Sequence, residues 1–200
     1  MKLYYAPGAC SRAAHIMLRE LDVPFDLAKV DLKTHTLEDG SDYYEVNPKG
    51  YVPALELDDG ALLTENIAVL AYLGDRKPGM MGDGGEIERY RMLERLAFVS
   101  TELHKGYGPL FNPSMPEEAK KLAVDRLASR FDVLDRELAE SSYLAGKDFT
   151  VPDAYAFTVL GWTRLFDIDL SPWRNVYAYF DRIKARPAVV QAVEAEKAAA

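Results

Sequence analysis

The chain has 200 residues, of which 48% are hydrophobic and 28% are charged, and its formal net charge at pH 7 is −8. This composition is typical of a soluble globular protein with enough interior for one large domain or two small ones. The acidic balance excludes the basic surface that nucleic acids and anionic membranes attract, so we expect neither as a partner.

The first 80 residues predict an α/β domain in the order βαβ followed by ββα. Short apolar or alternating segments indicate the strands, and apolar positions on one helical face indicate the helices. The order is that of a thioredoxin-like domain. The expected strands lie at residues 3–5, 25–32, 54–57 and 61–63, and the expected helices at 11–21 and 67–75.

A glycine-dense segment at residues 77–85 marks a domain boundary, so we expect domains at 1–80 and 86–200, the second entirely helical. Apolar residues recur about every 3.5 positions over 87–107, which predicts one long helix. Ser114 to Glu117 and Thr150 to Asp153 have the pattern of N-terminal capping boxes. The helix after Thr150 is apolar nearly all round, which favours the middle of a bundle. Two more helices are expected at 173–185 and from 189 to the end.

The single cysteine permits no intrachain disulfide, and it excludes cysteine-rich zinc sites and two-thiol redox cycles. No apolar run approaches the roughly 18–20 residues that a membrane-spanning helix needs. The N-terminus begins directly as a strand, without the apolar segment of a signal peptide. No metal-ligand spacing stands out. We therefore expect a cytoplasmic protein without a metal ion.

A proline at position 53 stands at the mouth of an apolar strand, where it cannot donate a ladder hydrogen bond. A cis Val52-Pro53 bond would account for it, and would turn the Val52 N–H and C=O outward to pair with an extended peptide. Thr64-Glu65-Asn66 then opens a helix whose free N–H groups attract a carboxylate. Together these features predict a site for a small anionic peptide. The alternative is a trans proline followed by an ordinary helix cap.

Cys10 lies just before the first expected helix, where helix-terminal N–H groups and the nearby Arg12 favour a thiolate. It is therefore a candidate nucleophile. The alternative is a buried structural cysteine, because free cysteines are among the most buried residues.

Several blocks of the sequence resemble the glutathione transferases. The glutathione-binding half of that family is similar to Gly50-Tyr51-Val52-Pro53-Ala54-Leu55 with Thr64-Glu65-Asn66. Residues 1–11, 102–107 and 149–155 resemble the bacterial beta class, in the family's order and spacing. The resemblance implies the glutathione transferase fold, an α/β N-terminal thioredoxin-like domain followed by an all-α helical bundle domain. It also implies glutathione as co-substrate and a homodimer.

The resemblance implies roles for individual residues. Cys10 stands at the position of the class's characteristic cysteine, and His104 is expected near the sulfur of glutathione, so both are expected to be catalytic. Glu65 can hold the α-ammonium group of the γ-glutamyl moiety, and Asn66 can hold the α-carboxylate of the same moiety. Asn66 stands where the class has Ser or Gly, but it keeps hydrogen-bond donors. The expected glutathione-binding residues are Cys10, His35, Val52, Pro53, Glu65, Asn66, Thr101, His104 and Lys105.

Two positions depart from the class. His35 stands where a lysine often holds the glycine carboxylate of glutathione, and a histidine of ordinary pKa loses much of that cationic contact at neutral pH. Ala97 replaces an asparagine that helps the site. These departures keep open a non-catalytic, ligand-binding member of the fold. Cys10, Pro53 and Glu65, all present, argue against that interpretation.

We expect a cytoplasmic, homodimeric glutathione transferase that conjugates the glutathione thiol to hydrophobic electrophiles, in detoxification or xenobiotic catabolism. The electrophile is expected against Tyr107, Phe111 and Trp162. A glutathione-dependent thiol transferase or peroxidase acting through Cys10 is the enzymatic alternative.

Overall fold

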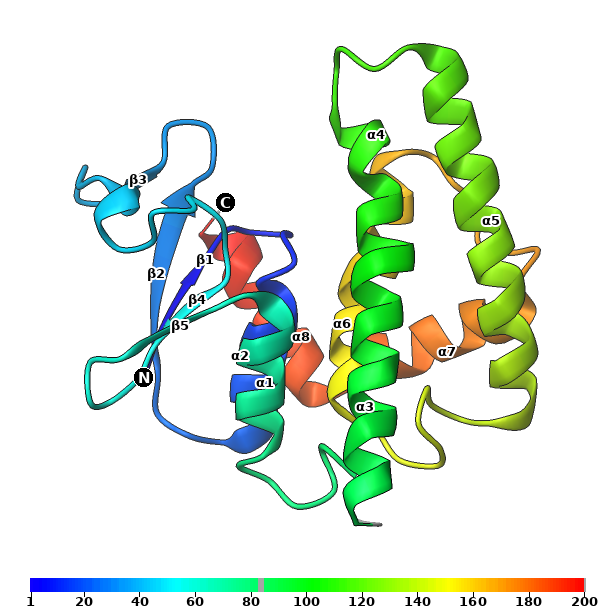
Figure 1. Cartoon of the computed structure of the whole chain (residues 1–200), viewed down its shortest axis with the longest axis horizontal. Coiled ribbons are helices and arrows are strands. Elements are labelled where there is room, and N and C mark those ends of the chain that lie inside the picture. Colours follow the sequence, from blue (N-terminus) through cyan, green and yellow to red (C-terminus); the bar gives the residue numbers. More distant parts are fainter. Residues whose placement is uncertain (83–84, 200) are drawn as a thin grey trace. The chain divides into compact units, whose positions relative to one another are not determined.

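The computed structural model describes residues 1–82 and 85–199 (Figure 1). The chain divides into two compact units, one comprising Met1–Pro78 with Ala185–Ala200 and the other Gly79–Lys184. In the described parts of the chain, no helix combines the length and the apolarity of a membrane span.

A five-stranded mixed sheet forms the centre of the first unit, with strand order β3-β2-β1-β4-β5. The central strand β1 is parallel to β2 and antiparallel to β4, and the outer pairs β2–β3 and β4–β5 are antiparallel. The parallel pair requires a crossover, which α1 provides. This is the expected βαβ–ββα order, with β3 as an additional short edge strand. The strands are β1 (Lys2–Tyr5), β2 (Asp26–Asp31), β3 (Thr36–Leu37), β4 (Ala54–Glu56) and β5 (Leu62–Thr64).

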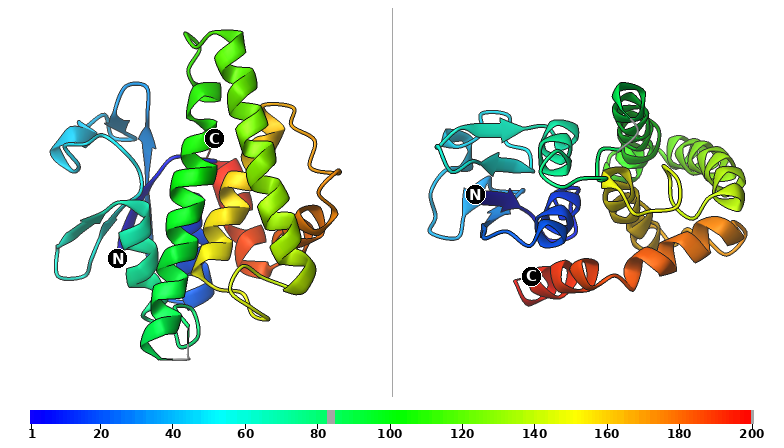
Figure 2. Two further views of the ribbon diagram at one scale, coloured as in Figure 1. Left: turned by 45° about the vertical axis from the view of Figure 1, so that its right-hand side comes forward. Right: turned by 90° about the horizontal axis from the view of Figure 1, so that it is seen from below.

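The described part of the first unit contains three α-helices, α1 (Arg12–Leu21), α2 (Asn66–Gly74) and α8 (Pro187–Ala198), and a 3-10 turn at Tyr43–Glu45. One face of α1 is apolar and buried, and α1 contacts both α2 and α8. Figure 2 shows α8, in red, running beside α1. The compact units thus divide the chain differently from the expected ranges 1–80 and 86–200, because the last helix packs on α1.

Helices make up the second unit. It contains α3 (Glu86–Phe98), α4 (Gly108–Phe111), α5 (Glu117–Glu140), α6 (Val151–Leu160) and α7 (Arg174–Lys184). Every residue of α6 is buried, and α6 contacts both α3 and α7, which confirms its expected place in the middle of the bundle. The long helix expected over 87–107 is helical throughout but not regular. After Phe98 it continues as a π-helical segment, Val99–His104, and a 3-10 turn, Lys105–Tyr107.

The two expected capping boxes differ in outcome. At α6 the prediction is confirmed, since the Thr150 N–H donates to Asp153 Oδ2 at 2.8 Å. At α5 it is wrong: the helix begins only after Pro116, and its N-terminus has no side-chain cap among the described residues. The Ser114 N–H donates instead to Asn112 Oδ1 at 3.0 Å. The extended Pro116 separates Ser114 from the first helical turn, so the serine cannot cap it.

Candidate functional site

The thiol of Cys10 contacts Val52, in the segment before β4 where the sequence predicted a cis proline. Its Sγ donates to the Val52 carbonyl oxygen at 3.2 Å. The Val52–Pro53 bond is cis, as expected. Cys10 is half-buried and Val52 is 7% exposed, so the sulfur lies at the edge of the first unit's core. Two features inferred separately from the sequence are therefore in direct contact.

A tight turn between β1 and α1 carries Cys10. The buried Ser11 hydroxyl accepts from the Ala6 N–H at 3.2 Å and donates to the Ala6 carbonyl at 3.3 Å. Gly8 has a φ of +76°, in the region that glycine adopts without strain. These local contacts fix the path of the backbone on both sides of the cysteine.

The start of α2 meets this turn through Asn66. The side chain of Asn66 is a donor to the Cys10 carbonyl, with Nδ2 at 3.4 Å, and the residue is only 9% exposed. Its Oδ1 is buried and has no hydrogen-bond partner among the described residues. A buried acceptor without a donor is costly, on the order of 1–3 kcal/mol, and such groups in native structures call for an explanation. A ligand donor at this position would supply one.

Glu65 precedes α2 with a φ of +71°, an unusual conformation for a residue other than glycine. Its carboxylate pairs with the Lys49 ammonium at 2.6 Å, and the side chains are 69% and 52% exposed. An ion pair this exposed contributes only about 0–1 kcal/mol. The sequence reasoning missed Lys49. In the β4–β5 hairpin Ala54 pairs with Thr64, so the residues before β4 and after β5 meet at the same end of the hairpin. The hairpin predicted from the sequence could therefore have indicated that Lys49 lies near Glu65.

His35 is held against the loop that leads to Val52. Its Nδ1 lies 3.2 Å from the Gly50 carbonyl oxygen, and its ring packs on Tyr44 with a centroid distance of 4.6 Å. A carbonyl oxygen only accepts, so Nδ1 must carry the hydrogen of this contact. The imidazole thus supports the loop before Val52, and its Nε2 is the atom left to meet a ligand.

In the second unit, His104 is the last residue of the π-helical segment, a kind of irregularity that is frequent at functional sites. Its Nδ1 lies 2.6 Å from the Tyr155 hydroxyl, and its ring meets Trp162 edge-on at 4.8 Å. Burial, with a smaller contribution from the charge of Lys105, lowers the pKa of His104 from 6.5 to about 4. The imidazole is therefore neutral at pH 7.

Thr101 and Lys105 flank His104 on the same helical segment, and both are exposed. The Thr101 hydroxyl donates to the Ala97 carbonyl at 2.9 Å, one turn earlier. Its hydrogen is thus engaged within the helix, and the hydroxyl oxygen keeps lone pairs that can accept a hydrogen bond. Ala97, where the class has an asparagine, contributes only this backbone oxygen.

An aromatic cluster contains all three residues expected to contact the electrophile. Trp162 meets Tyr107 and Phe111 edge-on at 5.6 and 5.3 Å. Phe166, which the sequence reasoning missed, packs on Phe111 at 4.8 Å. Tyr107 and Trp162 are buried, whereas Phe111 is 51% exposed, so Phe111 offers the accessible apolar surface.

The hydroxyl of Tyr107 is a second buried polar atom to which no described residue offers a hydrogen bond. Burial raises the pKa of Tyr107, so the phenol is protonated and able to donate. Tyr155, the partner of His104, was also missed, although it ends the block 149–155 that carried part of the resemblance.

The expected site residues thus form one group in each unit. The first unit holds Cys10, His35, Val52, Pro53, Glu65 and Asn66, and the second holds Thr101, His104, Lys105, Tyr107, Phe111 and Trp162.

Two family models match this chain. The glutathione S-transferase N-terminal domain matches residues 8–76, and the glutathione S-transferase C-terminal domain matches residues 98–187. The protein therefore belongs to the glutathione S-transferase family, a family of enzymes. The resemblance stated from the sequence and the fold expected from it are confirmed.

Three relatives indicate where the chain falls within the family. It is 44% identical to the glutathione S-transferase GstA of Escherichia coli O157:H7, with 98% of each chain covered. It is 46% identical to a beta-class glutathione S-transferase of Sphingomonas chungbukensis, with a TM-score of 0.93 and 98% of each chain covered. A sphingomonad glutathione S-transferase solved with glutathione is 44% identical, with a TM-score of 0.94 over 98% of this chain and 99% of the other.

Proposed function

We propose that this protein is a glutathione transferase that conjugates the thiol of glutathione to small hydrophobic electrophiles. The observation that carries the proposal is the buried Asn66 amide, whose unpartnered Oδ1 lies at the start of α2 beside the Cys10 turn. A glutathione-like peptide has the N–H and ammonium donors that this oxygen requires. The complex of a similar sphingomonad enzyme with glutathione supports the same ligand.

The charged groups of glutathione have complementary partners in the first unit. The N–H groups of the first turn of α2 favour the γ-glutamyl carboxylate, and Glu65 can pair with its ammonium group. The cysteinyl backbone can pair with Val52 as an added strand. Lys49 adds a cation beside Glu65, and His35 offers Nε2 to the glycine end. Thr101, His104 and Lys105 belong to the second unit, and a role in glutathione binding remains for them a prediction of the family resemblance.

The reaction requires a glutathione thiolate and an electrophilic carbon. The sulfur donates an electron pair, the C–S bond forms, and the bond to the leaving group breaks. A neutral His104 can donate one hydrogen bond to the thiolate, which stabilises its charge without a second full charge nearby. The electrophile is proposed to lie against the exposed Phe111, whose ring meets the buried Trp162 edge-on, with Tyr107 on the same tryptophan.

Titration calorimetry tests the proposal. Reduced glutathione should bind with a Kd between micromolar and millimolar, about −8 to −4 kcal/mol, and S-hexylglutathione should compete. Asn66→Ala should weaken binding by about 1–2 kcal/mol, because the variant removes the acceptor that the ligand satisfies. Gln191→Ala, which removes an exposed amide on α8, is the matched control and should bind as the wild type does. Absence of both heat and competition would contradict the proposed function.

A thiol-transfer activity through Cys10 is a second candidate, favoured by the contact of its thiol with the Val52 carbonyl at the proposed glutathione edge. The Cys10 thiolate would attack one sulfur of oxidised glutathione. A new S–S bond forms as the old one breaks, and reduced glutathione leaves with the proton that Cys10 gave up.

Because the chain has no second cysteine, the mixed disulfide is expected to persist until an external thiol attacks it. Intact-mass analysis after treatment with oxidised glutathione should show one glutathione adduct on the wild type and none on Cys10→Ala. An unmodified wild type would instead indicate a structural cysteine. Conjugation by Cys10→Ala can remain substantial, since the nucleophile in that reaction is the sulfur of glutathione itself.

We further propose a cytoplasmic homodimer. Ile87 and Tyr90 on α3 are 60% and 56% exposed, and apolar surface of this kind commonly marks contacts between subunits. Light scattering at micromolar protein should give twice the chain mass of 22.4 kDa. A mass equal to that of one chain would refute the dimer.

A further inference from the structure

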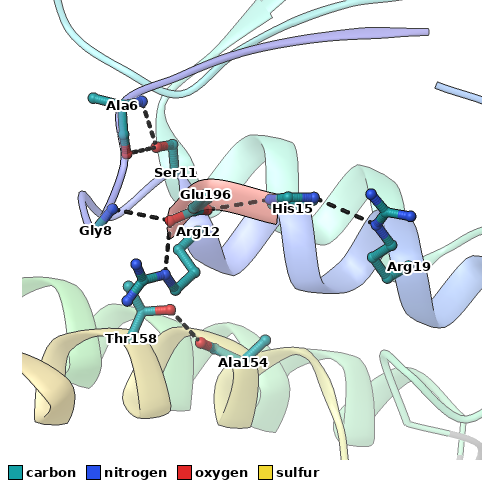
Figure 3. Close-up of polar contacts among 9 residues, drawn as sticks. All are labelled: Ala6, Gly8, Ser11, Arg12, His15, Arg19, Ala154, Thr158 and Glu196. Carbon is teal, nitrogen blue, oxygen red and sulfur yellow. Dashed lines mark hydrogen bonds and ion pairs between the residues drawn. The ribbon is translucent and has the colours of Figure 1, made fainter. Parts of the chain in front are cut away.

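The last helix of the chain places a fully buried carboxylate beside the turn that carries Cys10. Glu196 on α8 has an exposed fraction of 0%. Figure 3 shows its contacts with Gly8, Arg12 and His15. Glu196 Oε2 accepts from the Gly8 N–H at 2.9 Å and from Arg12 Nε at 2.8 Å. Its Oε1 lies 3.2 Å from His15 Nδ1. One side chain of the C-terminal helix thus bonds the turn at Gly8 and the start of α1 at Arg12 and His15.

The polar partners explain how this charge can be buried. A buried carboxylate requires an opposite charge and hydrogen bonds to remain ionised. Arg12, which is 20% exposed, supplies the charge. Arg19 Nε donates to His15 Nε2 at 3.4 Å, so the hydrogen of that imidazole lies on Nδ1 and points to Glu196 (Figure 3).

Two other contacts hold α8 in the first unit. At the start of the helix, Arg186 Nε pairs with Glu20 Oε1 at 2.8 Å, and beyond its last turn the Lys29 ammonium donates to the Ala199 carbonyl. Docking of α8 therefore does not depend on Glu196 alone, which leaves the bond to the Gly8 N–H as a separate role for this carboxylate.

The hydrogen bond from Gly8 connects Glu196 to the backbone close to the Cys10 sulfur. Gly8 lies two residues before Cys10, and with its φ of +76° its N–H is turned toward Glu196. On the other side of the cysteine, Ser11 closes the turn on Ala6. The turn is thus held at Gly8 by α8 and at Ala6, the residue directly after β1, by Ser11.

We propose that Glu196 is a positioning residue for Cys10. By holding Gly8 and Arg12 together, it sets the position of the sulfur relative to Val52 and to the start of α2. This positioning role rests on the proposed glutathione chemistry. The position of the Cys10 sulfur affects the reaction rate only for a reagent that also binds at the peptide-binding edge. A residue that merely tied α8 to α1 would contribute stability and nothing else.

The rates of two reagents with Cys10 separate these roles. Methyl methanethiosulfonate needs only an accessible thiolate, whereas oxidised glutathione must also fit the proposed peptide-binding edge. Both rate constants are measured by intact mass on the full chain, and their ratio is compared between variants. In Glu196→Gln, the rate with oxidised glutathione relative to that with the small reagent should fall about tenfold. Glu194→Gln, an exposed glutamate on the same helix, should stay within twofold of the wild type.

A general loosening of the first unit raises both rates together and leaves the ratio unchanged, so an unchanged ratio in Glu196→Gln would overturn the proposal. If that variant does not fold, the double variant Arg12→Gln/Glu196→Gln removes both charges together and is expected to show the same fall. An unchanged ratio of the two rate constants in this double variant would likewise overturn the proposal. Failure of the wild type to react with oxidised glutathione and to bind reduced glutathione would overturn the proposed function as well.

Discussion

Replacement of Asp153 by alanine is expected to lower the free energy of unfolding by about 3 kcal/mol. The carboxylate is completely buried and accepts four hydrogen bonds. Oδ1 accepts from the Leu144 N–H at 2.9 Å and from the Tyr179 hydroxyl at 2.8 Å. Oδ2 accepts from the N–H and the hydroxyl of Thr150, each at 2.8 Å. Alanine would leave the two N–H groups buried without an acceptor, while the two hydroxyls can rotate to seek others.

The size of this effect reflects two opposing changes in free energy. Burial raises the pKa of Asp153, so its charged form is disfavoured, and the four donors offset that penalty only in part. Removal of the carboxyl relieves the penalty but loses contacts that join the start of α6 to the preceding loop and to α7. The loss of these contacts is expected to outweigh the relief of the penalty.

Urea denaturation followed by tryptophan fluorescence measures the loss where it occurs, because both tryptophans, Trp162 and Trp173, lie in the second unit. Asp148→Ala removes an exposed carboxylate from the same loop and should change the free energy of unfolding by no more than about 0.5 kcal/mol. Equal midpoints for the two variants would show that the buried hydrogen bonds contribute no net stability.

The sequence predicted this cap but not its importance. Thr150 and Asp153 are three residues apart, a spacing that local rules recognise. Leu144 and Tyr179 lie nine and 26 residues from Asp153 and reach it only when the loop and α7 are packed. Spacing rules therefore find the local half of such a cluster, and tertiary contacts supply the rest.

The C-terminal helix shows the same limit more strongly. Glu196 stands in an alanine-rich segment between Glu194 and Lys197, and charged residues in such a segment indicate a solvated face. Its partners lie more than 180 residues earlier, and the choice of α1 as the surface that covers α8 depends on tertiary packing. For this reason both the buried carboxylate and the place of residues 185–200 in the first unit were missed.

The candidate site was predicted best where its residues are neighbours along the chain or lie in a sequence block that resembles the family. Cys10, Val52 and Asn66 were selected on such grounds, and they lie in contact. The π-helical segment before His104 was not predicted, since an apolar repeat near 3.5 residues is compatible with a regular helix. The segment contacts α6, which carries Tyr155, and tertiary contacts of this kind are not contained in a local apolar repeat.

Acidification from pH 7.5 to pH 5 is expected to destabilise the wild type by about 2 kcal/mol more than His104→Gln. Burial, followed by the charge of Lys105, lowers the pKa of His104 from 6.5 to about 4 in the folded protein. Above pH 6.5 the imidazole is neutral in both states and has no effect. Between pH 6.5 and 4 the unfolded chain binds a proton that the folded protein does not, so stability falls with pH. Below pH 4 the difference reaches its limit of about 3 kcal/mol.

Glutamine is a suitable replacement because it does not titrate and its amide can still bond the Tyr155 hydroxyl. The wild type and the variant share every other titratable group, including the buried Asp153, so those contributions cancel in the difference between the two unfolding free energies. Urea unfolding at both pH values gives that difference, and a value that does not change with pH would contradict the lowered pKa. A confirmed shift would mean that the His104 imidazole is uncharged at neutral pH. In the proposed mechanism its part would then be a single oriented hydrogen bond and not an ion pair.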